Sequence, residues 1–141
     1  MEINRFFLLL IVVVALFSFS TYFFYDYFVI ENIIKLNMSV KVSDHFGLTA
    51  DSDAIKFGMI KPGTSSERSI IVNNKAAYPL RVVIIKSGYI ADWVKVSENN
   101  FILKGNESRQ INFEVFVLNN IDFGNYTGKV KIIFKKTYFN R

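Results

Sequence analysis

The sequence of 141 residues contains no cysteine, two prolines, one tryptophan and one histidine, and these scarcities exclude several functions. Without thiols the chain cannot form disulfides, bind zinc or iron–sulfur clusters through cysteine, or use a cysteine nucleophile. The single histidine, His45, follows Asp44. An Asp-His pair without a positioned nucleophile and oxyanion-stabilising donors does not make a catalytic triad. We therefore predict that the protein is not an enzyme and that it has no cofactor.

The sequence also lacks the usual motifs of metal-binding and nucleic-acid-binding sites. Asp51-Ser52-Asp53 supplies two carboxylates, but Ca²⁺ takes about six to eight oxygen ligands, usually around a tight glycine turn. We interpret this segment as an Asx-rich turn and predict no metal site. The 17 basic residues exceed the 12 acidic ones, but they are spread along the chain, and no glycine-rich phosphate loop precedes a helix. This pattern predicts no nucleic-acid partner.

The N-terminal segment lacks charge over its whole apolar length. No charged residue occurs from Phe6 to Tyr25, and the segment has no polar face. At about 1.5 Å per residue, a helix of about 20 residues spans the roughly 30 Å of a bilayer's hydrocarbon core. We therefore predict a transmembrane helix. The residues that we place in the span are Phe6, Leu10, Val14, Phe17 and Phe24.

The flanks of this run indicate its orientation. Arg5 precedes the run, whereas Asp26 and Glu31 follow it, which favours a cytoplasmic N-terminus and an extracytoplasmic domain at the cell membrane. A cleaved signal peptide is the alternative, with Ser18-Phe19-Ser20 as the cleavage site. The thin basic region and the apolar residues that continue beyond Ser20 favour an uncleaved anchor. Arg5-Phe6 also does not match the small residue that pilin-type signals normally place there.

Beyond residue 35 the pattern changes to a period of two. Val40 and Val42 alternate with polar residues, and Val130, Ile132 and Phe134 do the same near the C-terminus. Frequent turn signals separate such runs, and no helical segment of 10 or more residues follows. We predict a membrane anchor and short stalk over residues 1–35 and a single antiparallel β-sandwich of about seven or eight strands over residues 36–141.

Two strands carry specific expectations. The nearly continuous apolar run Leu80–Ile85 predicts a central strand covered on both faces. The basic strand near the C-terminus predicts an edge strand that its charges protect from aggregation, with attraction to anionic lipid or an acidic wall polymer as the alternative. Its basic residues are Lys129, Lys131, Lys135 and Lys136, followed by Arg141.

Several motifs resemble one family of surface modules. Ile55–Ser65, with Phe57-Gly58 and Pro62-Gly63, is similar to the opening of many bacterial and archaeal immunoglobulin-like modules. Trp93–Val96, Phe101–Ser108 and Phe123–Gly128 resemble the tryptophan strand, a turn and a glycine-tyrosine-glycine hairpin of the α-galactosidase-associated immunoglobulin-like domains. The resemblance implies an immunoglobulin-like fold and a role as spacer, stalk or interaction domain, without catalytic residues.

Individual residues complete the site predictions. We expect Trp93 to anchor the core between the sheets and Tyr126 to make a corner contact through its hydroxyl. Three asparagines lie in glycosylation sequons, namely Asn37, Asn106 and Asn125.

These observations lead to two functional hypotheses. The first is a structural or protein-interaction module with membrane lipid around its helix. One face or an edge strand of the sandwich would dock a partner in the cell envelope, and addition of a strand to the edge would be the natural mode. One helix plus one β-sandwich is also the layout of archaeal motility-machine stators, which suggests a subunit of an envelope or surface-filament assembly by analogy of architecture. The alternative is a glycan- or cell-wall-binding module that uses Tyr78, Tyr89 and Tyr138.

Overall fold

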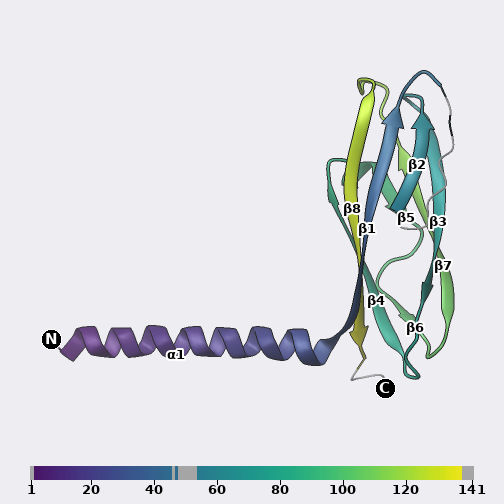
Figure 1. The fold of residues 1–141 in the computed structure, drawn as a ribbon. Coiled ribbons are helices and arrows are strands. Elements are labelled where there is room, and N and C mark those ends of the chain that lie inside the picture. Colours follow the sequence, from purple (N-terminus) through teal and green to yellow (C-terminus); the bar gives the residue numbers. More distant parts are fainter. Residues whose placement is uncertain (1, 46, 48–53, 138–141) are drawn as a thin grey trace.

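A long helix leads directly into a two-sheet β-domain (Figure 1). The computed structural model describes residues 2–45, 47 and 54–137, so that Asp51-Ser52-Asp53, Tyr138 and Arg141 lie outside the described residues. Helix α1 spans Glu2–Phe24, and a π-helical turn, η1, spans Tyr25–Val29. Strand β1 then runs from Ile30 to Val42.

The remaining strands form two facing sheets in a sandwich-like arrangement (Figure 1). One sheet, here called sheet A, has the order β2-β1-β8-β4-β6, and the other, sheet B, has the order β3-β7-β5. Only the β1–β2 pair is parallel. The strands are β2 (Ala54–Ile60), β3 (Ser65–Asn73), β4 (Leu80–Gly88), β5 (Val94–Val96), β6 (Phe101–Leu103), β7 (Ser108–Phe116) and β8 (Gly124–Lys136).

Strand β1 begins inside the segment that we expected to form a stalk. Ile30, Ile33 and Ile34 have a spacing that also suits a helix, which is why the sequence alone suggested an extension of α1. In the structure these residues form a strand instead, because they pair with β8: Ile33 lies opposite Ile133, and Ile34 lies opposite Ile132. The helix therefore meets the β-domain without an intervening stalk.

The basic C-terminal strand is not an edge strand, and this prediction was wrong. Strand β8 lies between β1 and β4 and pairs with both along most of its length. Val130, Ile132 and Phe134 are buried, while Lys129 and Lys131 on alternate positions are exposed. The lysines thus mark the outer face of a central strand. The alternation of apolar and polar residues indicates which face of a strand is exposed to solvent. It does not indicate whether another strand pairs with each of its edges.

Strand β4 is an interior strand of its sheet, as expected, but only one of its faces is covered. Leu80, Val82 and Ile84 are buried against sheet B, whereas Arg81 is exposed and Ile85 is 47% exposed. The expectation of burial on both faces was therefore wrong. A β-branched residue favours the extended backbone even on a solvated face, so an apolar run need not be buried throughout.

The glycine-tyrosine-glycine segment is also not a hairpin, because Gly124–Gly128 belongs to β8. Gly128 lies opposite Gly88 across the β4–β8 ladder. A Cβ on Gly88 would come within 2.8 Å of the Gly128 Cα, and Gly88 has a φ of +91°. Close approach of two strands, and not a turn, therefore requires these glycines.

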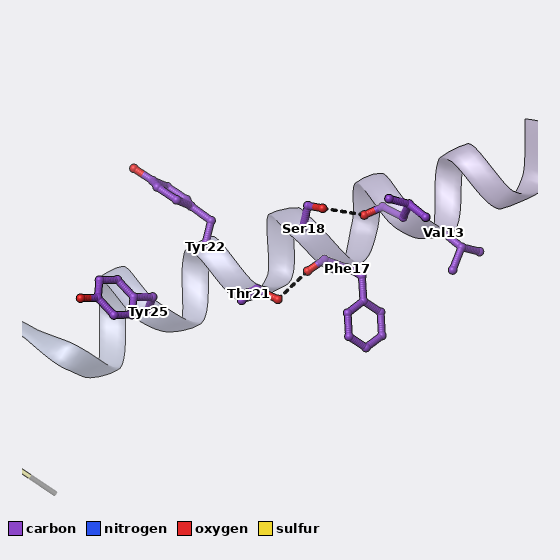
Figure 2. A pocket seen from close by; sticks show the side chains of 7 residues that line it. Val13, Phe17, Ser18, Thr21, Tyr22 and Tyr25 are labelled. Carbon is purple, nitrogen blue, oxygen red and sulfur yellow. Dashed lines mark hydrogen bonds between the residues drawn. The ribbon is translucent and has the colours of Figure 1, made fainter.

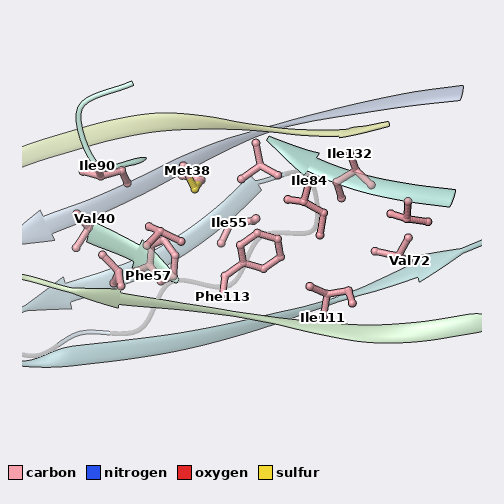
Figure 3. Close-up of a cluster of buried hydrophobic side chains, with 14 of the residues drawn as sticks. Met38, Val40, Ile55, Phe57, Val72, Ile84, Ile90, Ile111, Phe113 and Ile132 are labelled. Carbon is pink, nitrogen blue, oxygen red and sulfur yellow. The ribbon is translucent and has the colours of Figure 1, made fainter. Parts of the chain in front are cut away.

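The core lies between the inner faces of the two sheets (Figure 3). Met38 and Ile132 from sheet A face Ile111 and Phe113 from sheet B, and all four are at most 1% exposed. Burying one such side chain contributes about 1.5–3 kcal/mol. Met38 and Ile132 lie on the same two strands that continue toward α1, so the core also holds the base of α1 in place.

Asn74 is the one polar side chain that is fully buried among the described residues. Its amide nitrogen donates to the carbonyl oxygens of Tyr78 (2.9 Å), Leu103 (3.1 Å) and Lys104 (2.9 Å). Its amide oxygen accepts from the Ala76 backbone at 3.0 Å. These bonds join the β3–β4 connection to the β6–β7 turn, where backbone groups would otherwise be unpaired.

We expect Asn74→Ala to lower the free energy of unfolding by roughly 3 kcal/mol, because it leaves buried carbonyl groups without donors. Chemical denaturation of the full-length chain in detergent, followed by the fluorescence of Trp93, measures this change. Asn73→Ala is the matched control, since the Asn73 side chain is exposed, and it should change stability by less than about 0.5 kcal/mol. Equal effects of the two substitutions would contradict the assigned role of Asn74.

Candidate functional site

Helix α1 is long and apolar enough to cross a membrane. Within Asn4–Val29, the most apolar window of 18 residues has a mean hydropathy of 2.5, and none of that window is buried against the rest of the chain. The predicted span residues are all exposed on the helix, as lipid-facing side chains would be; they are Phe6, Leu10, Val14, Phe17 and Phe24. A spanning helix must also satisfy its few hydroxyl groups internally.

Two hydroxyl groups of α1 meet this requirement (Figure 2). Ser18 Oγ donates to the Val14 carbonyl at 2.9 Å, and Thr21 Oγ1 donates to the Phe17 carbonyl at 2.8 Å. Such bonds to the preceding turn satisfy these two donors within the helix. The hollow in Figure 2 is lined by residues of α1 and by Tyr25 at the start of η1, so it is a surface depression between side chains and not an enclosed ligand pocket.

The junction between helix and domain is held by side chains from three parts of the chain. Lys135 Nζ donates to the Tyr25 hydroxyl at 2.7 Å and lies 5.4 Å from the centre of its ring. The Glu31 carboxylate accepts the Tyr78 hydroxyl at 2.8 Å and forms an ion pair with Lys136 at 3.3 Å. Lys135 therefore attaches β8 to the turn that leaves the helix, and Glu31 ties the start of β1 to β8 and to the β3–β4 connection. Tyr78 is thus a junction residue and is far from any aromatic platform.

An aromatic cluster lies toward the other end of the domain. The rings of Tyr89, Trp93 and Tyr126, here called the distal aromatic cluster, lie with centroids 5.2–5.4 Å apart, and Tyr89 stacks on Tyr126. Tyr89 is 66% exposed, while the other two are partly buried and pack against the core. Such a cluster offers a flat apolar surface with polar edges, which suits protein or sugar partners.

The structure places the two expected core anchors at the margin of the core. Trp93 lies on a 3₁₀ turn, Ala91–Trp93, immediately before β5, and not within the strand. Tyr126 donates its hydroxyl to the Asp122 carbonyl at 2.8 Å. Burial, and then Tyr89 and Asp122, raise the pKa of Tyr126 above its usual 10.0, so the hydroxyl stays protonated at neutral pH.

More apolar side chains are exposed at the same end of the sandwich. Phe116 ends β7, and Leu118 and Phe123 lie in the β7–β8 connection. Phe123 is 66% exposed. We call Phe116, Leu118 and Phe123, together with the distal aromatic cluster, the distal apolar end. The sequence analysis did not single out Phe116 or Leu118, because only the folded arrangement of β4, β7 and β8 brings these distant segments to one end of the sandwich.

Two sheet edges are blocked by side chains, which bears on the expected docking mode. Ser66 Oγ and Arg68 Nε of β3 donate to the β2 carbonyls of Phe57 (3.0 Å) and Lys56 (2.8 Å). The Asn99 amide donates to the Ile84 carbonyl and accepts from its N–H, as a neighbouring strand would. A partner strand would have to displace these bonds, so the edges favour added strands less than the sequence suggested.

The other predicted residues form no chemical site. His45 Nδ1 lies 2.5 Å from Asp44 Oδ1 in an exposed loop, and no three metal-ligating side chains gather among the described residues. Of the sequon residues, Asn37 is exposed on β1, Asn106 occupies the β6–β7 turn with a φ of +58°, and Asn125 is exposed on β8.

We expect Tyr126→Phe to lower the denaturation midpoint of the full-length chain without changing the slope, because the bond to Asp122 is lost. Tyr89→Phe is the control, since its hydroxyl has no hydrogen bond among the described residues. The raised pKa of Tyr126 means that this stabilisation is complete below pH 10.0 and declines as the pH rises above it. A difference that persists unchanged at strongly alkaline pH would contradict this assignment.

No protein-family model matches this chain, and no curated protein or solved structure is significantly similar to it. The residues and geometry of the chain itself therefore carry the functional inference.

Proposed function

We propose that this chain is a single-pass membrane protein of the cell surface, with a cytoplasmic N-terminus and an extracytoplasmic β-domain. The domain acts as a structural or protein-interaction module within an envelope or surface-filament assembly. The observation that carries this proposal is the junction, at which α1 passes into β1 without a flexible linker. Lys135 and Glu31 attach the neighbouring strands to the same place.

A direct connection between the helix and the β-domain suits a structural subunit better than a ligand-binding domain on a flexible linker. A domain that searches for ligands gains reach from a flexible glycine- or serine-rich tether. Here β1 continues the membrane helix and is paired on both sides, with β8 along its whole length and with β2 from Asn37 onward. Force applied along the helix would have to break many strand hydrogen bonds together. The domain is therefore kept at one height and in one direction relative to the membrane.

The distal apolar end is the surface that we assign to the partner. It lies at the end of the sandwich opposite the junction, so α1 leaves it uncovered (Figure 1). Exposed apolar side chains that gather in one region mark interaction sites more often than single exposed residues do. Aromatic residues also dominate the energetic centres of protein interfaces.

We also propose that the domain is immunoglobulin-like, with its strands permuted. The order β3-β7-β5 matches strands B, E and D of that fold, and β4 and β8 take the places of C and F. The place of the last strand, G, beside F and antiparallel to it, is taken by β1. The anchored N-terminal strand would thus fill a position that usually belongs to the C-terminus, which agrees with the family resemblance of the motifs and departs from its usual connectivity.

A glycan-binding module is the second candidate, and the distal aromatic cluster is the observation that favours it. A sugar ring could lie on the exposed face of Tyr89, supported from behind by Tyr126 and Trp93. Of the two other tyrosines named for this role, Tyr78 is engaged at the junction, and Tyr138 lies outside the described residues. The aromatic platform for a sugar would therefore consist of Tyr89, Trp93 and Tyr126, and of the tyrosines that the sequence suggested it would include only Tyr89.

Site-specific crosslinking in native membranes tests the leading proposal. A photoreactive residue in place of Phe123 should link the full-length chain to one defined envelope protein at constant stoichiometry. The same probe at Ser69, on the outer face of sheet B, is the matched control and should not. Tyr89→Ala should weaken the Phe123 link. The proposal would be contradicted if both positions gave only self-links or scattered links. In that case, the glycan alternative would be favoured if the full-length chain bound envelope polysaccharide and Tyr89→Ala abolished this binding.

Single-cysteine variants test the orientation, because the chain has no cysteine of its own. A membrane-impermeant maleimide should label Ser69→Cys in intact cells. It should label Asn4→Cys only after the membrane is opened. The reverse pattern would contradict the proposed topology, and labelling of both variants in intact cells would mean that α1 does not separate two compartments.

A further inference from the structure

The outer faces of the two sheets differ sharply in charge. On sheet A, the ladders align Lys35 with Lys131, and Lys135 with Arg81. The residues between them in sequence, such as Ile132 and Phe134, are buried, so these cationic side chains share the outer face. We call this surface the basic face. Its cationic residues are Lys35, Lys41, Arg81, Lys129, Lys131 and Lys135.

Acidic residues do not balance this surface. Among the described residues of the five strands of sheet A, Glu31 is the one acid, and it is paired with Lys136 at the junction. Sheet B is different, because its outer face aligns Glu67 with Glu114 and Glu114 with Lys95. Basic charge on the domain is therefore directed to one side.

Apolar side chains lie among the cations of the basic face. Ile33 and Val83 flank Ile133 across the ladders, and Ile85 lies opposite Lys131. Ile33 is 36% exposed and Ile85 is 47% exposed. A face that mixes lysine with exposed isoleucine matches the boundary of a bilayer, where anionic phosphates overlie hydrocarbon.

The direction of α1 brings the basic face toward the membrane. Figure 1 shows that α1 extends sideways from the sandwich, on the side of β1 and β8, while β3 and β7 lie on the opposite side. The strands run crosswise to the helix. A helix that spans the bilayer would therefore lay sheet A along the headgroups, and Lys135, which contacts Tyr25 at the helix end, belongs to both the junction and this face.

We propose that the basic face docks on anionic phospholipid headgroups of the membrane that α1 spans, so that the domain lies flat with sheet B turned away. This proposal rests on the membrane anchoring proposed above. Lysine and arginine attract lipid phosphate within about 10 Å at 0.1 M salt, and an anchored face stays within that range. The junction limits the domain to few orientations, so modest attraction suffices to hold this one.

Spin labels on two faces of the full-length chain in nanodiscs test this inference. Ser87→Cys reports the basic face, because Ser87 lies opposite Lys129, and Ser69→Cys reports the outer face of sheet B. In phosphatidylglycerol-containing discs, the Ser87 label should be several-fold less accessible to a water-soluble relaxation agent than in pure phosphatidylcholine. High salt should reverse this shielding, and the Ser69 label should remain accessible throughout.

Charge reversals provide the matched comparison. Lys131→Glu should remove the shielding of the Ser87 label, while Lys95→Glu, with the same change in net charge on the other sheet, should leave it intact. Equal shielding in both lipids, shielding of Ser69 instead, or insensitivity to Lys131→Glu would overturn the proposal. A label at Ser18→Cys reads the anchor separately, since water exposure there would mean that the helix itself is outside the bilayer.

Discussion

The pairing of β1 with β8 is the interaction on which the rest of the structure depends. It runs antiparallel from Ile30 opposite Lys135 at the junction to Val42 opposite Gly124 at the far end. It brings together β1 and β8, the first and last of the described strands, so the domain closes only when β8 has been made. This contact of high sequence separation is entropically costly to form, and it must therefore be supported by a continuous core on one side.

The same residues build the core and the surface charge. On β8, Val130, Ile132 and Phe134 fill the interior, while Lys129 and Lys131 point outward. A shift of one residue in register would exchange the two sets and place lysine in the core, so the charged face also enforces the register. Lysines that protect a free edge in other sheets here specify the alignment of a central strand.

Period-two alternation and the uncharged run of α1 were sufficient to predict the helix, most strands and which residues of β1, β7 and β8 are buried. Neighbour relations were not predictable, because an inner strand and an edge strand with one wet face show the same alternation. That is why β8 was predicted as an edge strand. The start of β1 at Ile30 was predicted as a stalk for another reason, because the spacing of its isoleucines also suits a helix. Gly128 was read as a turn signal because sequence does not show that Gly88 lies opposite.

The candidate surfaces were still less visible in the sequence. Tyr89 follows β4 and Tyr126 lies near the start of β8, so the whole connection between these strands separates them in sequence. The pairing of β4 with β8 brings their rings together. The sequence suggests that Asn74 is only a turn residue. In the structure, its amide nitrogen donates hydrogen bonds to the carbonyl oxygens of Tyr78, Leu103 and Lys104. In both cases the deciding contacts are long-range, and single-sequence patterns carry only local information.

Strand β8 contributes to each surface to which we assign a role. Lys135 reaches the helix end, Lys129 and Lys131 form the basic face, and Tyr126 belongs to the distal aromatic cluster. Because one rigid strand carries all of them, their relative positions are set by backbone geometry and not by a hinge. A domain laid on the bilayer by its lysines would then present Tyr89 and Tyr126 at a constant distance from the anchor. Constant placement of a contact surface is what a subunit of a fixed assembly requires, and a flexible tether would remove it.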